Sequence, residues 1–282
     1  MTKRNLTNSL ATLGATTILV GQLAFVLSAR ADWNPGDPAK WVQMPDLQNG
    51  MDVYDTFSPI LPYNKILADD FRCTQTGPIT SIHIWGSWLN DRVPRDASGT
   101  PIPPIFDLSF HLDVPAGSDP QFPYSHPGAQ VWDRVFQPQQ MRIYATSSER
   151  FYDPNQGTNG VIGFDTQVWQ YNFFIDPTNA FFQNVGNIYW LNVQVQPQPF
   201  EDQFGNPFVF GWKTSTNHFN DDSVFGDNTS LSQPPPFWRP LVDPATGQSL
   251  DQAFVLDTIP EPSTFALLGL GASLLVVLRR RR

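Results

Sequence analysis

Two pairs of adjacent aspartates are the clearest candidates for chemistry in this sequence. Asp69-Asp70 follows a short apolar stretch, and Asp221-Asp222 comes shortly after His218. Carboxylates beside an imidazole can act as an acid/base pair or hold a cation. Adjacent side chains of an extended chain point to opposite faces, so a catalytic pair would need one residue from each aspartate pair. The alternative is that these carboxylates are simply solvated.

The segment after the second pair is rich in the oxygen ligands that calcium prefers. Residues 221–230 contain Asp221, Asp222, Asp227 and Asn228. Calcium takes several oxygen ligands, and loops often supply them, but the spacing here does not match an EF-hand. The sequence therefore offers one candidate for a structural calcium ion, against the alternative of an acidic, solvated loop. No other cofactor is expected.

An aromatic residue followed by two amides gives a candidate sugar-binding face. Trp190, Asn192 and Gln194 share one face of a strand predicted over 187–196, while the apolar residues between them take the other. An aromatic ring supplies apolar area to a sugar, and amide groups fix its orientation. The sequence thus predicts glycan contact at these three residues if their face is exposed. If loops cover that face, Trp190 belongs to the core.

The elements that must position these residues are strands. Residues 106–114 alternate without a fault, so that one face is formed by Phe106, Leu108, Phe110, Leu112 and Val114. Clusters of Gly, Pro, Asn and Asp separate this segment from the other strand candidates, which are 79–85, 140–145, 168–175, 187–195, 208–214 and 253–256. Many short strands with such turns predict a mainly β fold, an antiparallel β-sandwich or jelly roll.

Composition narrows the function classes. The 282 residues include 22 Phe and 9 Trp, enough for a large core, and 27 Pro, which disfavours long helices. The 26 Asp and Glu exceed the 17 Lys and Arg, so a nucleic-acid partner is not expected. Cys73 is the single cysteine, which excludes an internal disulfide. No serine elbow, phosphate loop or zinc-protease motif occurs, and we expect no enzyme.

The first residues predict an export signal. Lys3 and Arg4 precede an apolar stretch over 10–27, and Ala29-Arg30-Ala31 offers small residues at the two positions that signal peptidase reads. We therefore expect a signal peptide over 1–31 and a single acidic domain over 32–258. The alternatives are an uncleaved anchor helix at 1–31 and two small domains within 32–258.

The last residues combine three features. Pro260, Glu261 and Pro262 precede an apolar run over 263–278, and a basic cluster follows: Arg279, Arg280, Arg281 and Arg282. As a helix the run is about 24 Å long, short for a bilayer core of about 30 Å. The arginines are expected to stay on the cytoplasmic side. We expect this segment, 259–282, to anchor transiently in the inner membrane.

These three features resemble the PEP-CTERM sorting signal. The resemblance implies an exosortase as partner, which would remove the tail and release or attach the protein at the cell surface. It also implies a producer of extracellular polysaccharide. The alternative is an ordinary single-pass anchor.

The middle of the chain is similar to an uncharacterised β-rich domain found upstream of such tails. The resemblance runs from about Trp41 to Asp257 and rests on these segments: residues 66–73, 84–88, 211–215, 218–222, 243–247 and 254–256. The resemblance implies a fold and an occurrence in proteins that carry such tails, and it assigns no catalytic residue.

Together these observations predict an exported, non-enzymatic protein of the cell surface or extracellular matrix. Its role would be structural or adhesive, with extracellular polysaccharide as a candidate partner. The alternative is a calcium-assisted carbohydrate-active enzyme, a glycoside hydrolase or a polysaccharide lyase.

Overall fold

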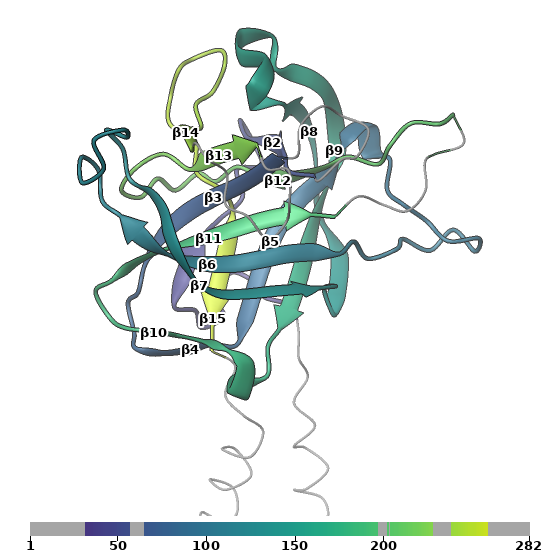
Figure 1. The fold of residues 1–282 in the computed structure, drawn as a ribbon. Coiled ribbons are helices and arrows are strands. Elements are labelled where there is room, and N and C mark those ends of the chain that lie inside the picture. Colours follow the sequence, from purple (N-terminus) through teal and green to yellow (C-terminus); the bar gives the residue numbers. More distant parts are fainter. Residues whose placement is uncertain (1–31, 57–64, 197–201, 203, 228–237, 259–282) are drawn as a thin grey trace, which may run out of the picture. The chain divides into compact units, whose positions relative to one another are not determined.

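In the computed structural model, the described residues are 32–56, 65–196, 202, 204–227 and 238–258 (Figure 1). Residues 32–258 form one compact unit. The predicted signal peptide, the predicted sorting segment with Pro260, Glu261, Pro262 and its four arginines, and Asn228 lie outside the described residues.

Seven strands form the first sheet, in the order β1-β15-β5-β12-β2-β8-β9. Their bounds are β1 (Trp41–Gln43), β2 (Met51–Tyr54), β5 (Ser81–Trp88), β8 (Gln140–Tyr152), β9 (Val161–Phe174), β12 (Phe210–Lys213) and β15 (Phe254–Asp257). Neighbours are antiparallel except β2 and β8, which are parallel. A further β5–β9 pairing closes β5, β12, β2, β8 and β9 into a ring, called here the strand ring.

Six antiparallel strands form the second sheet, in the order β14-β13-β3-β11-β6-β7. Their bounds are β3 (Lys65–Arg72), β6 (Phe106–Val114), β7 (His126–Phe136), β11 (Ile188–Val195), β13 (Val224–Asp227) and β14 (Arg239–Pro240). A small third sheet pairs β4 (Gly77–Ile79) with β10 (Phe181–Gln183). The mainly β prediction is therefore confirmed, while the sandwich or jelly-roll type stays a prediction.

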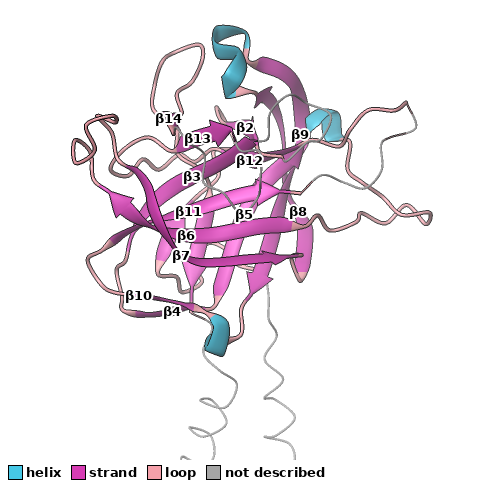
Figure 2. Ribbon diagram, viewed as in Figure 1, coloured by secondary structure: helices cyan, strands magenta, loops and turns pink. Residues whose placement is uncertain are grey.

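Helical structure in the described residues is limited to short 3₁₀ turns (Figure 2). They are η1 (Leu89–Asp91), η2 (Pro154–Asn159) and η3 (Pro177–Asn179). Proline opens η2 and η3, where its fixed φ suits the first helical position. Within the described part of the chain, no helix has the length and apolar character needed to span a membrane.

The two larger sheets share one hydrophobic core. Aromatic rings meet across it: Phe71 of β3 lies 6.1 Å from Phe254 of β15, and Phe106 of β6 lies 5.3 Å from Phe210 of β12, measured between ring centroids. All four side chains are completely buried. Aromatic pairs of this kind stabilise beyond the area they bury, so these contacts help to hold one sheet on the other.

The alternating segment 106–114 forms β6, but its two faces differ from the prediction. Phe106, Leu108 and Phe110 are buried as expected, whereas Leu112 is 43% exposed. On the opposite face, which alternation would leave to solvent, His111 is buried, and its Nδ1 lies 2.9 Å from the Gly128 carbonyl oxygen. The pairing of β6 with β7 shifts register on both sides of His111. The alternation is therefore a reliable guide to the strand and not to the burial of its last residues.

Candidate functional site

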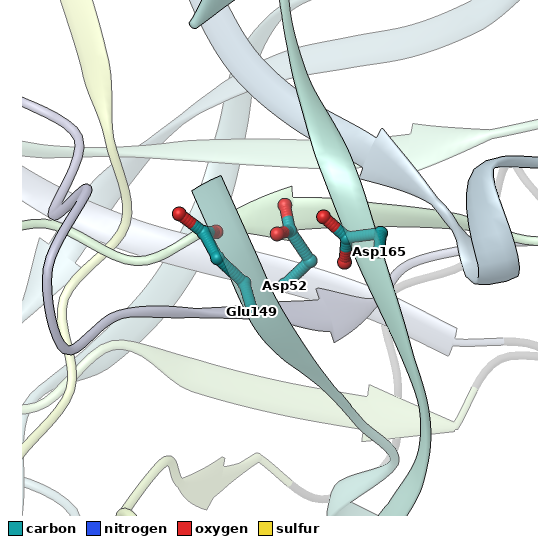
Figure 3. Close-up of side chains that lie close together, drawn as sticks. All are labelled: Asp52, Glu149 and Asp165. Carbon is teal, nitrogen blue, oxygen red and sulfur yellow. The ribbon is translucent and has the colours of Figure 1, made fainter. Parts of the chain in front are cut away.

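Three buried carboxylates come together in the strand ring. Asp52 of β2, Glu149 of β8 and Asp165 of β9 each offer an oxygen atom that lies within 4.8 Å of the other two (Figure 3). Their exposed fractions are 0%, 4% and 1%. Figure 3 shows the carboxyl groups side by side on three different strands. We call these residues the carboxylate cluster.

Strand register explains why these residues meet. The β12–β2 pairing places Lys213 directly opposite Asp52, and the β8–β9 pairing places Glu149 directly opposite Asp165. Residues opposite each other in a pair of strands lie on the same face with their side chains close together. Because β2 and β8 are also neighbours, the two polar pairs meet on one face of the sheet.

One buried ammonium group faces the three carboxylates. Lys213 Nζ donates a hydrogen bond to Glu149 Oε2 and lies 3.8 Å from Asp52 Oδ2. Burial raises the pKa of Asp52 well above its usual range, and the neighbouring Asp165 and Glu149 carboxylates raise it further, while Lys213 opposes the shift. Burial and the Glu149 charge likewise raise the pKa of Asp165 to about 7. The single positive charge of Lys213 therefore does not neutralise the carboxylate cluster when all three of its members are ionised.

A polar cavity of about 670 Å³ adjoins the carboxylate cluster. Glu149 belongs to both the cluster and the cavity wall, which is completed by Asp46, Gln48, Asn49, Gly50, Ser148, Arg150, Thr214, Ser215, Thr216, Asp243, Thr246, Gln248, Ser249 and Leu250. Gly50 is required here, because a Cβ atom would lie 2.4 Å from the Asp46 carbonyl oxygen and 2.8 Å from Lys213 Nζ. The cavity and the buried cluster are thus neighbours.

The other two cavity carboxylates are already engaged. Asp46 Oδ1 accepts hydrogen bonds from the backbone N–H groups of Gln48 and Asn49, at 2.9 and 3.0 Å. Asp243 Oδ2 accepts one from Arg150 Nη2 at 2.9 Å. Burial acts to raise the pKa of Asp243, but its hydrogen bonds outweigh burial and hold that pKa below its usual value. Both carboxylates thus accept hydrogen bonds that fix the conformation of the cavity wall.

Two sequence families account for most of the chain. The family described as domain of unknown function (DUF7901) matches residues 39–257. The chain belongs to the DUF7901 family. The PEP-CTERM protein-sorting motif matches residues 258–282, which confirms the resemblance and indicates an exported protein processed by an exosortase. No curated protein and no solved structure matches the chain.

The sugar-binding face predicted on β11 of the DUF7901 domain is not exposed. Trp190, Asn192 and Gln194 are 0%, 1% and 1% exposed, so the expected accessible face is wrong. Trp190 packs in a small cluster with Trp238, and its indole Nε1 donates to Asp113 Oδ1 at 2.8 Å. Burial of a tryptophan with its N–H satisfied is the ordinary role of this residue. The alternative, that Trp190 belongs to a core, is the one confirmed.

The loop predicted to bind calcium does not gather its carboxylates. Asp227 accepts from Lys65 Nζ at 2.8 Å through one oxygen and from Arg239 Nη2 at 2.7 Å through the other. Asp221 accepts from the Ser125 N–H at 2.9 Å. In the described part of the chain, no group with metal-binding spacing includes any residue of the predicted set, which was Asp221, Asp222, Asp227 and, outside that part, Asn228. These contacts engage Asp221 and Asp227 with donors of the protein itself, and calcium binding by this loop stays a prediction.

The aspartate pair at 69–70 serves two separate networks. Asp69 Oδ2 accepts from Gln43 Nε2 at 2.9 Å and from the Gln252 N–H at 2.6 Å, whereas Asp70 Oδ2 accepts from Asn220 Nδ2 at 2.6 Å. The two side chains thus take different partners, as expected for adjacent residues of a strand. Burial raises the pKa of Asp70 to about 8, partly against the Asn220 hydrogen bond.

His218 contacts Asp251 and Ser249, but not as a catalytic triad would. Its Nδ1 lies 3.1 Å from Asp251 Oδ1 and 3.1 Å from Ser249 Oγ. A proton relay between a serine and a carboxylate needs both ring nitrogens of the histidine, one for each partner. The side chain is 52% exposed. This group therefore does not have the geometry of an activated nucleophile.

The carboxylate cluster itself was missed by sequence reasoning. Its members are far apart in the chain, and their proximity depends on strand pairings that no local pattern encodes. Two weak signals exist: Asp52 interrupts the apolar segment 51–54, and Glu149 is one of three glutamates in the chain. An acid inside an apolar strand indicates either an exposed face or a buried polar site.

Proposed function

We propose that this exosortase-sorted protein works at the cell surface or in the extracellular matrix, in a structural or adhesive role. Its DUF7901 domain would bind extracellular polysaccharide in the polar cavity, without cleaving it. The observation that carries the proposal is the chemistry of the cavity wall, where amide, hydroxyl, carboxylate and guanidinium groups surround about 670 Å³.

The size and lining of the cavity suit a polyhydroxylated ligand. Small-molecule sites commonly enclose about 300–1,000 Å³ and use a few polar groups to fix orientation. Gln48, Asn49 and Gln248 are exposed and offer amide groups that both donate to and accept from hydroxyls. Such a wall recognises sugars by hydrogen bonding instead of by stacking on a tryptophan.

The state of the cavity carboxylates supports binding over catalysis. Glu149 is paired with Lys213, Asp243 with Arg150, and Asp46 with backbone N–H groups. A glycosidase needs one carboxyl group free to give a proton and a second free to act as base or nucleophile. Carboxylates held in this way order the wall of a binding site. The position of Glu149 at the wall is the one observation that favours the enzyme alternative.

The proposal is tested by measuring binding of the producing cell's extracellular polysaccharide to the full chain in mild detergent. Gln248→Ala and Asn49→Ala remove exposed amides from the wall, so each is expected to weaken binding about five- to tenfold. Gln130→Ala removes an amide from the exposed surface of β7 and is the matched control. Equal affinity for all four proteins would overturn the cavity as the binding site.

A further inference from the structure

The strand ring directs one polar side chain from each of its five strands toward the same place. They are Ser87 of β5, Lys213 of β12, Asp52 of β2, Glu149 of β8 and Asp165 of β9. All are at least 96% buried. Polar groups are costly to bury without partners, and charged groups are more so. A function for this polar centre has to explain why five strands contribute to it.

Within the described part of the chain, most of the oxygen atoms in this centre have no hydrogen-bond partner outside the centre. Both carboxylate oxygens of Asp52, both of Asp165 and Oε1 of Glu149 lack one. The Ser87 hydroxyl is completely buried and faces the Asp165 carboxylate, whose pKa it lowers by hydrogen bonding. Native proteins satisfy nearly all buried polar atoms, so a group of unsatisfied oxygens in one place indicates a missing partner. Ser87 adds a neutral oxygen donor to the three carboxylates.

Charge identifies the kind of partner. Three carboxylates and the Lys213 ammonium carry a formal charge of −2 when ionised, and a divalent cation would neutralise it. Oxygen donors alone select hard cations such as Ca²⁺, Mg²⁺ or Mn²⁺ over zinc or copper. The cluster oxygens lie within 4.8 Å of one another, which is twice a typical Ca²⁺–oxygen distance of about 2.4 Å. Calcium is the first candidate because Mg²⁺ usually keeps several waters and is bound by only one or two carboxylates.

We infer that the strand ring of the DUF7901 domain holds a hard divalent cation, calcium first, bound by Asp52, Glu149 and Asp165 with Ser87 as a neutral oxygen donor. Lys213 orients Glu149 through their hydrogen bond. Glu149 also lines the polar cavity, so the cavity gives the ion a route to the centre. This site is separate from the loop at 221–228 and does not depend on polysaccharide binding.

The test uses the full chain in mild detergent, stripped with EDTA and exchanged into chelator-free buffer. Calorimetric titration with Ca²⁺, Mg²⁺ and Mn²⁺ is expected to give one bound ion per chain, and the electron paramagnetic resonance of aqueous Mn²⁺ should diminish as it binds. Thermal unfolding should shift upward with Ca²⁺ concentration, because a ligand that binds only the folded state stabilises it.

Variants locate the ion. Asp165→Asn keeps the side-chain shape and is expected to weaken cation binding by at least about tenfold, and Ser87→Ala by a smaller factor. Asp133→Asn on the exposed surface of β7 and Asp222→Asn in the acidic loop are matched controls, with unchanged affinity expected. The wild-type titration decides the inference even if Asp165→Asn fails to fold. No heat, no loss of Mn²⁺ signal and no shift in unfolding at millimolar cation would overturn it, as would wild-type affinity in both cluster variants.

Discussion

Lys213 and Asp52 lie opposite each other on neighbouring strands, with Nζ 3.8 Å from Oδ2 and both side chains completely buried. A buried ion pair gains little net stability, because removing two charges from water costs about as much as their attraction returns. Breaking such a pair is different, since it leaves a charge without compensation. Lys213 is therefore expected to be more important for the folded state than its location in a short strand suggests.

Lys213→Met tests this relationship. The variant leaves Asp52 and Glu149 without their ammonium partner and is expected to lower the free energy of unfolding by about 3–5 kcal/mol. Urea unfolding followed by tryptophan fluorescence measures the change. Arg134→Met, an exposed cation on β7, is the control and should stay within about 0.5 kcal/mol of the wild type. A loss of less than about 1 kcal/mol at Lys213 would contradict the assigned role.

Trp190 is predicted to affect stability and not sugar binding. Trp190→Ala removes a completely buried ring and is expected to cost about 3–5 kcal/mol, whereas Trp190→Phe keeps much of the packing and loses the hydrogen bond to Asp113, about 1–2 kcal/mol. Urea unfolding of both variants measures these losses. Polysaccharide affinity per folded Trp190→Phe molecule should equal that of the wild type. A selective loss of binding in a fully stable variant would restore the exposed-face hypothesis.

Asp70 predicts how stability depends on pH. Its pKa in the folded protein is about 8, because of burial and the nearby Asp251, Asp113 and Asp221 charges, while an unfolded chain ionises it near 4. Between these values the folded state holds a proton that the unfolded state has lost. The protonated Asp70 therefore contributes fully to the free energy of unfolding below about pH 4. This contribution is lost as the pH rises through 8, by up to about 1.4 kcal/mol per pH unit.

The measurement is urea unfolding from pH 5 to 8 in the presence of EDTA, comparing the wild type with Asp70→Asn. The variant keeps the shape of the side chain but cannot ionise, so its stability should decline less over this range. An identical pH dependence in the two proteins would show that Asp70 is ionised in the folded state.

The sorting motif predicts a separation between folding and processing. We expect membrane orientation to be impaired when neutral residues replace Arg279, Arg280, Arg281 and Arg282. The reason is that basic residues next to a membrane segment stay on the cytoplasmic side. Replacement of Glu261 should leave the DUF7901 domain folded and change tail removal. Cell fractionation and the mass of the released protein measure both effects. Unchanged release after the arginine replacement, or a lost fold after the Glu261 replacement, would count against this separation.

Local sequence patterns predicted much of the fold. Period-two alternation located β6, and the segments at 187–195 and 253–256 correspond closely to β11 and β15. The segments at 140–145 and 168–175 marked only parts of β8 and β9, because the rest of β8 mixes polar and apolar residues and the first half of β9 is more exposed than its second half. Strand β3 was missed because the Asp69-Asp70 pair sits within it, and only the hydrogen bonds from Gln43, Gln252 and Asn220 make those acids tolerable there.

The candidate site could not be predicted in the same way. Asp52, Glu149 and Asp165 meet because the β2–β8 and β8–β9 pairings bring them together, and pairing between distant strands leaves no mark at fixed spacing. The burial of Trp190 has a related cause. Alternation places Trp190 opposite the apolar residues of its strand, but Trp238, remote in sequence, packs in the same cluster. Alternation reports which residues share a face, and not what covers it.

The most direct test of the proposed function combines two measurements on one sample. The full chain is titrated with the producing cell's extracellular polysaccharide, and binding and the concentration of reducing ends are followed together. We expect saturable binding with no increase in reducing ends, and weaker binding by Gln248→Ala. Reducing ends that accumulate in proportion to the protein would contradict it in favour of a carbohydrate-active enzyme, and absence of binding would contradict polysaccharide as the partner.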